Sequence, residues 1–321
     1  MGQQDEALRS LQAALRISRG HIDEEAQRGN CHTLDVTVQS HIPVLTFRYV
    51  RTTIPMPLIE AEIHHFWNTV IKAAKHWDAS NPKHDTLVRY LLSARSMGTL
   101  KRPQPTLEGE TPEANQSDQQ EIIICSDGSK FWSDLPFLSQ DLVEEWTQRF
   151  YTAEYDGENN LRSNLASFVG RLISVGVWNG PAVCALSLFR ETLETSRPVV
   201  QALDASSSQK ETNFNVQTLL CALQQMLYYS EERIIDLSNN SHNIADSTVA
   251  QDISGLGELA VQSGLSSSGY YPDRWHFWVQ RLENLAKSEL SGASDSAECC
   301  LDVMRSAAKN IQGPLASRLD S

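Results

Sequence analysis

The stretch that decides the fold runs from residue 58 to residue 77 and reads LIEAEIHHFWNTVIKAAKHW. Apolar side chains recur in it every three or four positions, which places them on one face of an α-helix. These side chains are Ile59, Ile63, Phe66, Val70, Ala74 and Trp77. The stretch therefore predicts a long helix that lies against a core.

Helical patterns continue toward the C-terminus. Asn81 and Pro82 are typical of an N-cap and a first helical position, so a second helix should form an antiparallel hairpin with the first. Further helices are expected to begin near Ser139, Leu161, Pro181, Phe214, Pro272 and Asp295. The alternation of strands and helices that marks a doubly wound sheet is absent. We expect an all-α fold, an irregular bundle of about eight helices.

The pattern on the N-terminal side of residue 58 is different. Residues 5–18 have leucines at helical spacing and predict one further helix. Residues 33–53 instead contain two short runs rich in β-branched and aromatic residues, residues 34–38 and 44–50. These runs predict a small β-like insert near the N-terminus.

Two polar segments interrupt the helical pattern. Residues 101–121 combine three prolines with mostly polar residues, and residues 238–271 are rich in Ser, Asn and Gly. Such compositions bury too little apolar surface to offset the entropy of ordering, so we expect flexible linkers. The predicted organisation is an N-terminal helix and β-like segment over residues 1–57, one helical domain over 58–311, and a tail over 312–321.

Charge and composition exclude several classes of function. The chain has 27 Lys and Arg against 40 Asp and Glu, a formal net charge of -13, which repels polyphosphates and anionic membrane surfaces. We therefore expect no nucleic-acid partner and no membrane partner. The sequence has no signal-peptide pattern and no apolar run long enough to span a bilayer, and its six cysteines lack zinc-site spacing. These features predict a cytoplasmic or nuclear protein with free thiols.

Two motifs were weighed as cofactor or metal sites. Residues 255–260, GLGELA, match a dinucleotide-binding loop, but that loop functions between a strand and a helix and here lies in a Ser-rich stretch. His64, His65 and His76 share one predicted helix with Glu60, yet no second cluster completes a metal centre. We expect no cofactor and no metal.

Three residues are the candidates for a pocket or an anchor. Trp275 and Trp278 could line a pocket or a partner groove, although aromatic residues at helical spacing more often belong to a core.

Arg190 lies on an otherwise apolar stripe, where a cation must reach water or meet a carboxylate. Glu194 is the local partner for Arg190, and an acid from a neighbouring helix is the stronger one. The pair would be either a structural tie between helices or an anchor at the mouth of a pocket.

Several stretches together resemble a fungal family of helical proteins known as domain of unknown function three-six-three-two. The likeness covers about residues 60–310 and rests on helix-face patterns. The matching stretches are residues 67–74, 84–88, 135–138 before Trp146, 164–168, Ala185 and Leu186 through Arg190, Leu193 and Glu194, and Arg274 and Trp275 with Trp278. The resemblance supports a helical fold and implies no activity.

These observations favour a helical binding or scaffold protein that recognises another protein or a small apolar molecule. The alternative is an enzyme of fungal small-molecule metabolism that uses no cofactor, such as an isomerase, cyclase or transferase. Its site would be an apolar pocket between helices. The sequence does not decide between the two, and it does not indicate an oligomeric state.

Overall fold

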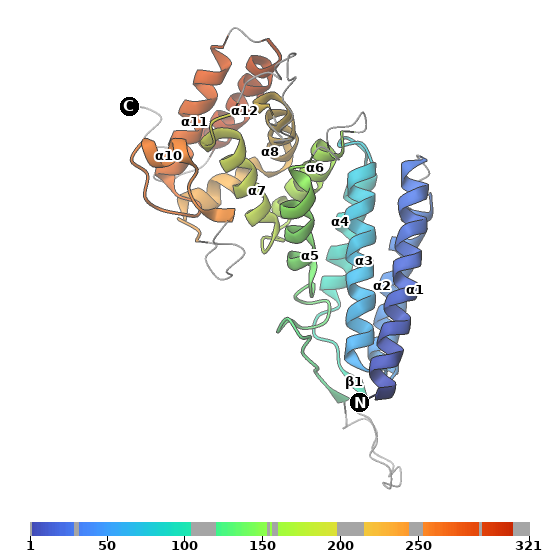
Figure 1. The fold of residues 1–321 in the computed structure, drawn as a ribbon. Helices are drawn as coiled ribbons and strands as arrows, with labels where there is room; N and C mark the ends of the chain where they lie inside the picture. Colours follow the sequence, from blue (N-terminus) through green and yellow to red (C-terminus); the bar gives the residue numbers. More distant parts are fainter. Residues whose placement is uncertain are drawn as a thin grey trace. The chain divides into compact units, whose positions relative to one another are not determined.

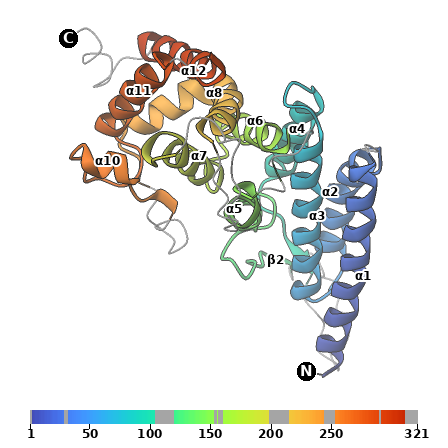
Figure 2. The ribbon, with the colours of Figure 1, turned by 45° about the horizontal axis from the view of Figure 1, so that its top comes forward.

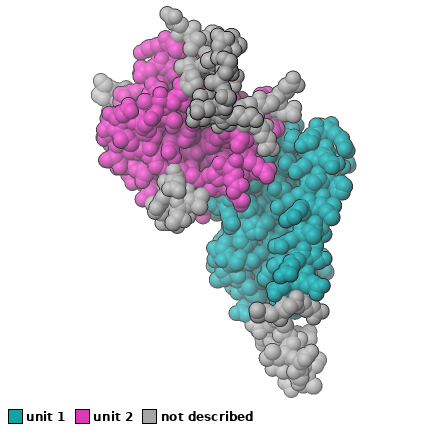
Figure 3. Space-filling view, viewed as in Figure 1, with its two compact units in different colours: residues 1–77, 81–142 teal, residues 78–80, 143–321 magenta. Residues whose placement is uncertain are grey.

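A computed structural model describes most of the chain, and its described parts are predominantly helical (Figure 1). The described residues are 2–28, 32–103, 120–152, 155, 160–197, 215–243, 253–288 and 291–310. They form eleven α-helices, so the predicted all-α class is confirmed, with more helices than expected. The chain divides into two compact units, residues 1–77 with 81–142 and residues 78–80 with 143–321, coloured separately in Figure 3.

The first unit is built around the helix that the sequence predicts most clearly. Its helices are α1 (Gly2–Gln27), α2 (His32–Arg51), α3 (Met56–His76) and α4 (Lys83–Ser96). Both α1 and α2 pack along α3, as Figure 2 shows. The predicted apolar stripe of α3 is buried along its whole length, from Ile59 to Ala74, and Trp77 after it is buried too. Burial of this stripe provides the hydrophobic stabilisation of the unit.

The predicted β-like insert is wrong, because residues 32–51 form the helix α2. Two opposite faces of α2 are apolar, and this produces the near-continuous run of β-branched and aromatic residues that resembles strands. One face is buried against the unit through Leu34, Val38, Ile42, Leu45 and Tyr49. The other face exposes Val36, Val44 and Phe47. Packing against α3 therefore overrides the local preference for β structure.

Short strand pairing and a long loop complete the first unit. Strand β1 (Arg102–Pro103) pairs antiparallel with β2 (Gln120–Glu121). The loop that follows carries Trp132, which is fully buried and donates its indole N–H to Thr46 Oγ1 at 2.7 Å. It leads into α5 (Leu138–Glu145).

The second unit is a bundle in which α6 and α8 pack closely together. Its elements are the π-helical turn η2 (Trp146–Phe150), α6 (Leu161–Ser174), α7 (Pro181–Phe189), the π-helical turn η4 (Arg190–Glu194), α8 (Val216–Asn239), α10 (Glu258–Gln262), α11 (Pro272–Ala286) and α12 (Ser291–Asn310). A Cβ at Gly170 of α6 would lie 2.4 Å from the carbonyl oxygen of Met226 in α8, so only glycine permits this approach. Helix α12 packs against α8 and α11.

The predicted linkers coincide in part with residues outside the described ranges. Residues 104–119 and 244–252 and the predicted tail, residues 312–321, all lie outside them. The described parts of the second predicted linker are residues 238–243, which include the end of α8, and residues 253–271, which contain the short helix α10. Compact packing does not decide where an independently folding domain begins, so the predicted domain boundaries stay a prediction.

Candidate functional site

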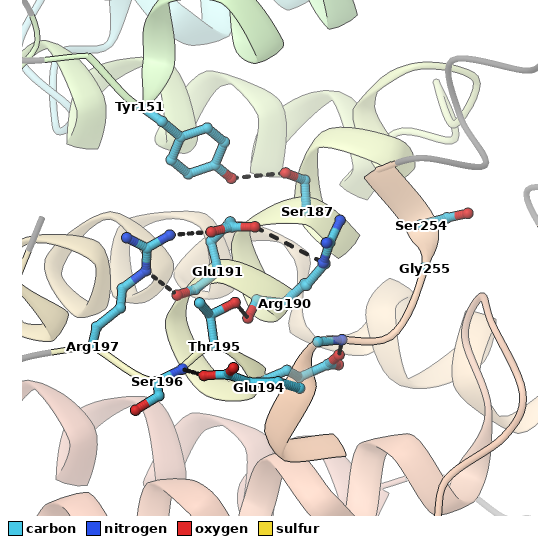
Figure 4. Close-up of polar contacts among 12 residues, drawn as sticks. Tyr151, Ser187, Arg190, Glu191, Glu194, Thr195, Ser196, Arg197, Ser254 and Gly255 are labelled. Carbon is cyan, nitrogen blue, oxygen red and sulfur yellow. Dashed lines mark hydrogen bonds and ion pairs between the residues drawn. The ribbon is translucent and has the colours of Figure 1, made fainter. Parts of the chain in front are cut away.

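The site lies where α7 gives way to η4, shown in Figure 4. Gly180, at φ +80°, turns the chain into α7, and Pro181 occupies the start of the helix, as the sequence predicts. After Phe189 the helix widens into the π-helical turn η4. A π-turn inserts residues relative to α-helical phase, so the side chains beyond it rotate away from the stripe that an α-helix would give.

This change of phase moves Arg190 and Glu194 away from their expected positions. The side chain of Arg190 is 30% exposed and its Nε lies 3.9 Å from Glu191 Oε1, while the side chain of Glu194 is fully buried. Glu194 is therefore not the partner of Arg190 that helical spacing suggests. The partner of Glu194 is a cation from another helix, Arg274 of α11.

Glu194 and Arg274 form a buried ion pair at the centre of a network. Arg274 donates from Nε to Glu194 Oε1 at 2.6 Å and from Nη2 to Oε2 at 3.0 Å. Trp278 Nε1 also donates to Oε1, at 2.7 Å, and the backbone N–H of Gly257 donates to Oε2 at 2.8 Å. Each carboxylate oxygen thus accepts two hydrogen bonds. We call Glu194, Gly257, Arg274 and Trp278 the Glu194 network.

The remaining donors of Arg274 are used by backbone carbonyls. Nη1 donates to the carbonyl oxygens of Ser254 at 3.0 Å and Gly269 at 2.9 Å, and Nη2 donates to that of Gly255 at 3.0 Å. Together with the two bonds to Glu194, every N–H of the guanidinium has an acceptor. A charge pair can stay buried away from water when every hydrogen-bonding group of both ions has a partner, as here.

The GLGELA motif contributes to this network through Gly257. A Cβ at Gly257 would lie 2.6 Å from both Glu194 Cβ and the Glu194 carbonyl oxygen, so the backbone can approach only without a side chain. The glycine thus has the role it has in a phosphate-binding loop, close approach of an N–H to an anion. Here the anion is the carboxylate of Glu194.

The two candidate tryptophans differ in their surroundings. Trp278 is fully buried, stacks on Phe189 with ring centroids 4.2 Å apart, and belongs to the Glu194 network. Trp275 is also buried, but its indole N–H has no hydrogen-bond partner within the described ranges. Both rings lie in the core of the second unit, and their role as pocket residues stays a prediction.

A second group of polar side chains, partly exposed at Arg190, Glu191 and Arg197, lies on η4 and next to it, and we call it the η4 polar cluster. Its members are Tyr151, Ser187, Arg190, Glu191 and Arg197. Glu191 forms an ion pair with Arg197, whose Nε also donates to the Glu191 carbonyl oxygen at 2.9 Å. The hydroxyls of Tyr151 and Ser187 share a hydrogen bond of 2.8 Å (Figure 4). Tyr151 and Glu191 follow no apolar periodicity, so the sequence pattern did not single them out.

Burial sets the protonation state of Tyr151. Desolvation raises the pKa of Tyr151 well above its usual range, the hydrogen bond with Ser187 opposes this shift, and the negative charge of Glu191 adds to it. The phenol therefore stays neutral at physiological pH. Trp146 Nε1 donates to the phenolic oxygen at 3.2 Å, and the phenolic proton and the Ser187 hydroxyl proton share the hydrogen bond between the two groups.

The histidines of α3 lie apart from one another's partners. His64 contacts both carboxylate oxygens of Asp141, at 2.8 and 2.9 Å, and His65 contacts Ser18 Oγ at 3.3 Å. In the ranges that the structure describes, no group of three or more His, Cys, Asp or Glu side chains is placed to hold a metal ion. The expectation of no metal and no cofactor stays a prediction.

Comparison with known proteins decides the family. A family model described as a protein of unknown function, DUF3632, matches residues 67–282, more than half of the chain. The chain belongs to the DUF3632 family. This confirms the resemblance inferred from the sequence, and the matched residues include the whole Glu194 network. Helices α1 and α2 lie outside the match.

One curated relative comes from Penicillium oxalicum and is named "Oxopyrrolidines biosynthesis cluster protein G". It is 27% identical over 281 residues, which cover 84% of this chain and 72% of the relative. No solved structure matches the chain. Among the helices described, none is both long and apolar enough to cross a membrane.

Proposed function

We propose that this DUF3632 protein is a helical binding protein of fungal small-molecule biosynthesis. It binds a small molecule at the η4 polar cluster without converting it. The name of the Penicillium oxalicum relative supports the biosynthetic setting, because it assigns that protein to an oxopyrrolidine biosynthesis cluster. The geometry of the second unit supports the binding role.

One observation carries the proposal, the contrast between the two polar groups on η4. The hydrogen-bonding capacity of Glu194 and Arg274 is fully used inside the protein, so these ions hold the turn in place and have nothing left for a ligand. Three members of the η4 polar cluster, Arg190, Glu191 and Arg197, lie on or next to the same turn and are partly exposed. A binding site gains affinity when its groups are held rigidly before the ligand arrives. The Glu194 network provides that rigidity.

The chemistry of the cluster suits a ligand with a hydrogen-bond donor beside an acceptor. One of the two protons of Tyr151 and Ser187 is used in their shared hydrogen bond, so the other can donate to a carbonyl oxygen, and the carboxylate of Glu191 can accept from an N–H. A lactam amide presents this pair of groups. We therefore take the oxopyrrolidine ring, the ring named in the relative's biosynthetic cluster, as the probe.

The cofactor-independent enzyme, the alternative from the sequence, would need a proton donor or acceptor tuned to physiological pH at this place. The raised pKa of Tyr151 moves its phenol further from titration at physiological pH, and Glu191 is paired with Arg197. Both groups are better suited to holding a ligand than to moving its protons. This favours binding over catalysis.

Isothermal titration with pyrrolidin-2-one and its acylated derivatives tests the proposal. We expect saturable binding that Glu191→Gln weakens by about tenfold or more, the loss of a charge-assisted hydrogen bond. The matched control is Asp236→Asn, which removes another partly exposed, ion-paired carboxylate from the same unit and should leave the affinity unchanged.

Mass spectrometry of the recovered ligand separates binding from catalysis. Recovery of unchanged ligand supports the proposal, and conversion to a product would favour the enzyme instead. An absence of binding, or equal binding by the wild type and Glu191→Gln, would contradict a site at the η4 polar cluster.

A further inference from the structure

Helix α1 is attached to the first unit mainly through polar groups. It packs along α3, as Figure 2 shows. Two of its side chains, Ile22 and Ala26, are buried, whereas its leucines are only partly covered. Arg19 Nε and Glu25 Oε2 are buried on this helix without a hydrogen-bond partner in the ranges that the structure describes. An unsatisfied buried polar atom costs stability, so α1 is held less firmly than the helices that bury an apolar stripe.

His65 of α3 lies beneath α1, where three helices meet. Its Nε2 contacts Ser18 Oγ of α1 at 3.3 Å, and its ring lies against that of His41 of α2, with the two ring centroids 5.7 Å apart. The residue is 3% exposed, and its Nδ1 has no hydrogen-bond partner among the described residues. Burial, with added repulsion from His41 and from Arg19 of α1, lowers the pKa of His65 to about 4. A positive charge is therefore unfavourable on this ring.

His76, in the last turn of α3, is a second histidine close to α1. Burial lowers its pKa to about 4, Lys72 and Lys75 of α3 add to this shift, and the charge of Asp23 on α1 opposes it. Asp23 Oδ1 also lies 2.6 Å from Lys72 Nζ, which ties α1 to the same end of α3. Both histidines are thus neutral at physiological pH while α1 is in place.

Acid should favour release of α1. An imidazole in water titrates near pH 6.5, so His65 and His76 take up protons at a higher pH once α1 no longer covers them. Docking of α1 is therefore fully favoured above about pH 6.5 and is lost as the pH falls toward about 4, by up to about tenfold per pH unit for each histidine. His64 of the same helix behaves in the opposite sense, because its hydrogen bond with Asp141 raises its pKa.

We propose that α1 is an acid-released element of the first unit: protonation of His65 and His76 frees it from α3 while α2 and α3 stay folded. The geometry carries the inference, because a charged His65 would lie between a second imidazole and a guanidinium, buried under a helix that has few apolar contacts. Helices α2 and α3 bury apolar stripes against each other and do not depend on α1 for that contact. The inference is independent of the proposed function, which concerns the second unit.

Hydrogen exchange of the full chain, followed by mass spectrometry at about pH 7.5 and about pH 5, tests the proposal. The protection factor of each peptide corrects for the effect of pH on the intrinsic exchange rate. Peptides of α1 should lose at least about tenfold of their protection between the two pH values, and peptides of α2 and α3 should keep theirs. Unchanged protection of α1, or an equal loss in all three helices, would overturn the proposal.

The double variant His65→Gln with His76→Gln assigns the effect, because glutamine keeps a polar side chain and does not titrate. Its α1 peptides should show less than about a twofold change with pH, even if α1 docks less firmly at pH 7.5, since the readout is the change with pH. The matched control is His21→Gln, an exposed histidine on α1 itself, which should keep the wild-type fall. A wild-type fall in the double variant would overturn the role of these histidines.

Circular dichroism at pH 7.5 checks that the double variant is folded. If it is not, His76→Gln alone serves, because this position is only partly buried and tolerates a polar side chain. This single variant should lessen the loss of protection on acidification, and an undiminished loss would contradict the proposal.

Discussion

Two glutamates on η4, three residues apart, have opposite surroundings. Glu194 is fully buried and accepts four hydrogen bonds, from Arg274, Trp278 and Gly257. Glu191 has a side chain that is 21% exposed, and it pairs with Arg197, which is 16% exposed. The comparison teaches that solvent exclusion and saturation, more than the presence of opposite charges, decide what an ion pair does. The inner pair is closed off from solvent, and the outer pair keeps partial exposure.

The π-turn creates this difference. In a continuous α-helix residue 194 would follow residue 190 along one stripe, and both would share one face. The wider turn instead buries Glu194 and leaves Arg190 partly exposed. π-turns are often found at functional sites, in agreement with the placement of the η4 polar cluster.

Removal of the buried cation should give the largest effect. Arg274→Met keeps the volume but leaves Glu194 charged, buried and without its ion partner, which should cost about 3 to 5 kcal/mol of unfolding free energy. Denaturant unfolding followed by tryptophan fluorescence measures it. Arg305→Met is the control, because Arg305 forms an exposed ion pair with Glu283 in the same unit and its loss should cost under about 1 kcal/mol. Equal costs for the two variants would contradict the contrast between buried and exposed pairs.

A smaller effect is expected from Gly257→Ala. The backbone of Gly257, at φ -76°, accepts any residue, so the cost comes from the added Cβ, which would lie 2.6 Å from Glu194 atoms. Such overpacking costs about 1 to 3 kcal/mol, measured in the same unfolding experiment. The control is Gly20→Ala on α1, where a Cβ meets nothing within 4 Å and alanine should be neutral or stabilising. A neutral Gly257→Ala would show that the close approach to Glu194 is not needed.

The smallest effect on stability is expected from Arg190→Ala. Its guanidinium is partly exposed and lies 3.9 Å from Glu191, so removal should cost under about 1 kcal/mol. The same variant should weaken ligand binding at the η4 polar cluster, which titration calorimetry measures. A loss of stability as large as that of Arg274→Met would mean that Arg190 belongs to the buried Glu194 network.

The fold could be predicted where one face of a helix is apolar. The apolar residues of α3 recur at the helical period and the opposite side of the helix is polar, so the sequence predicts which residues are buried. The residues of α2 do not, because two apolar faces leave no clear period and β-branched residues predominate. The helix forms because α3 buries its inner face, and that contact is absent from local sequence.

The candidate site could be predicted only in part. Trp278 was selected by its helical spacing, and Arg190 by its place on an apolar stripe, but the π-turn broke that stripe. The pairing of Glu194 with Arg274 joins residues 80 positions apart, and spacing in a single sequence cannot reveal it. Gly257 belongs to a motif in which a backbone N–H closely approaches an anion. The structure has such an approach, but the anion is the carboxylate of Glu194.

The central claim is that the inner pair, Glu194 with Arg274, stabilises the fold and that the outer pair, Glu191 with Arg197, contributes little to stability. A double-mutant cycle on each ion pair tests this claim most directly. The inner cycle uses Glu194→Leu and Arg274→Met, and the outer cycle uses Glu191→Leu and Arg197→Met. Unfolding free energies should give a coupling of about 2 to 3 kcal/mol for the inner pair and under about 1 kcal/mol for the outer pair. Equal couplings, or a larger coupling for the outer pair, would contradict the account.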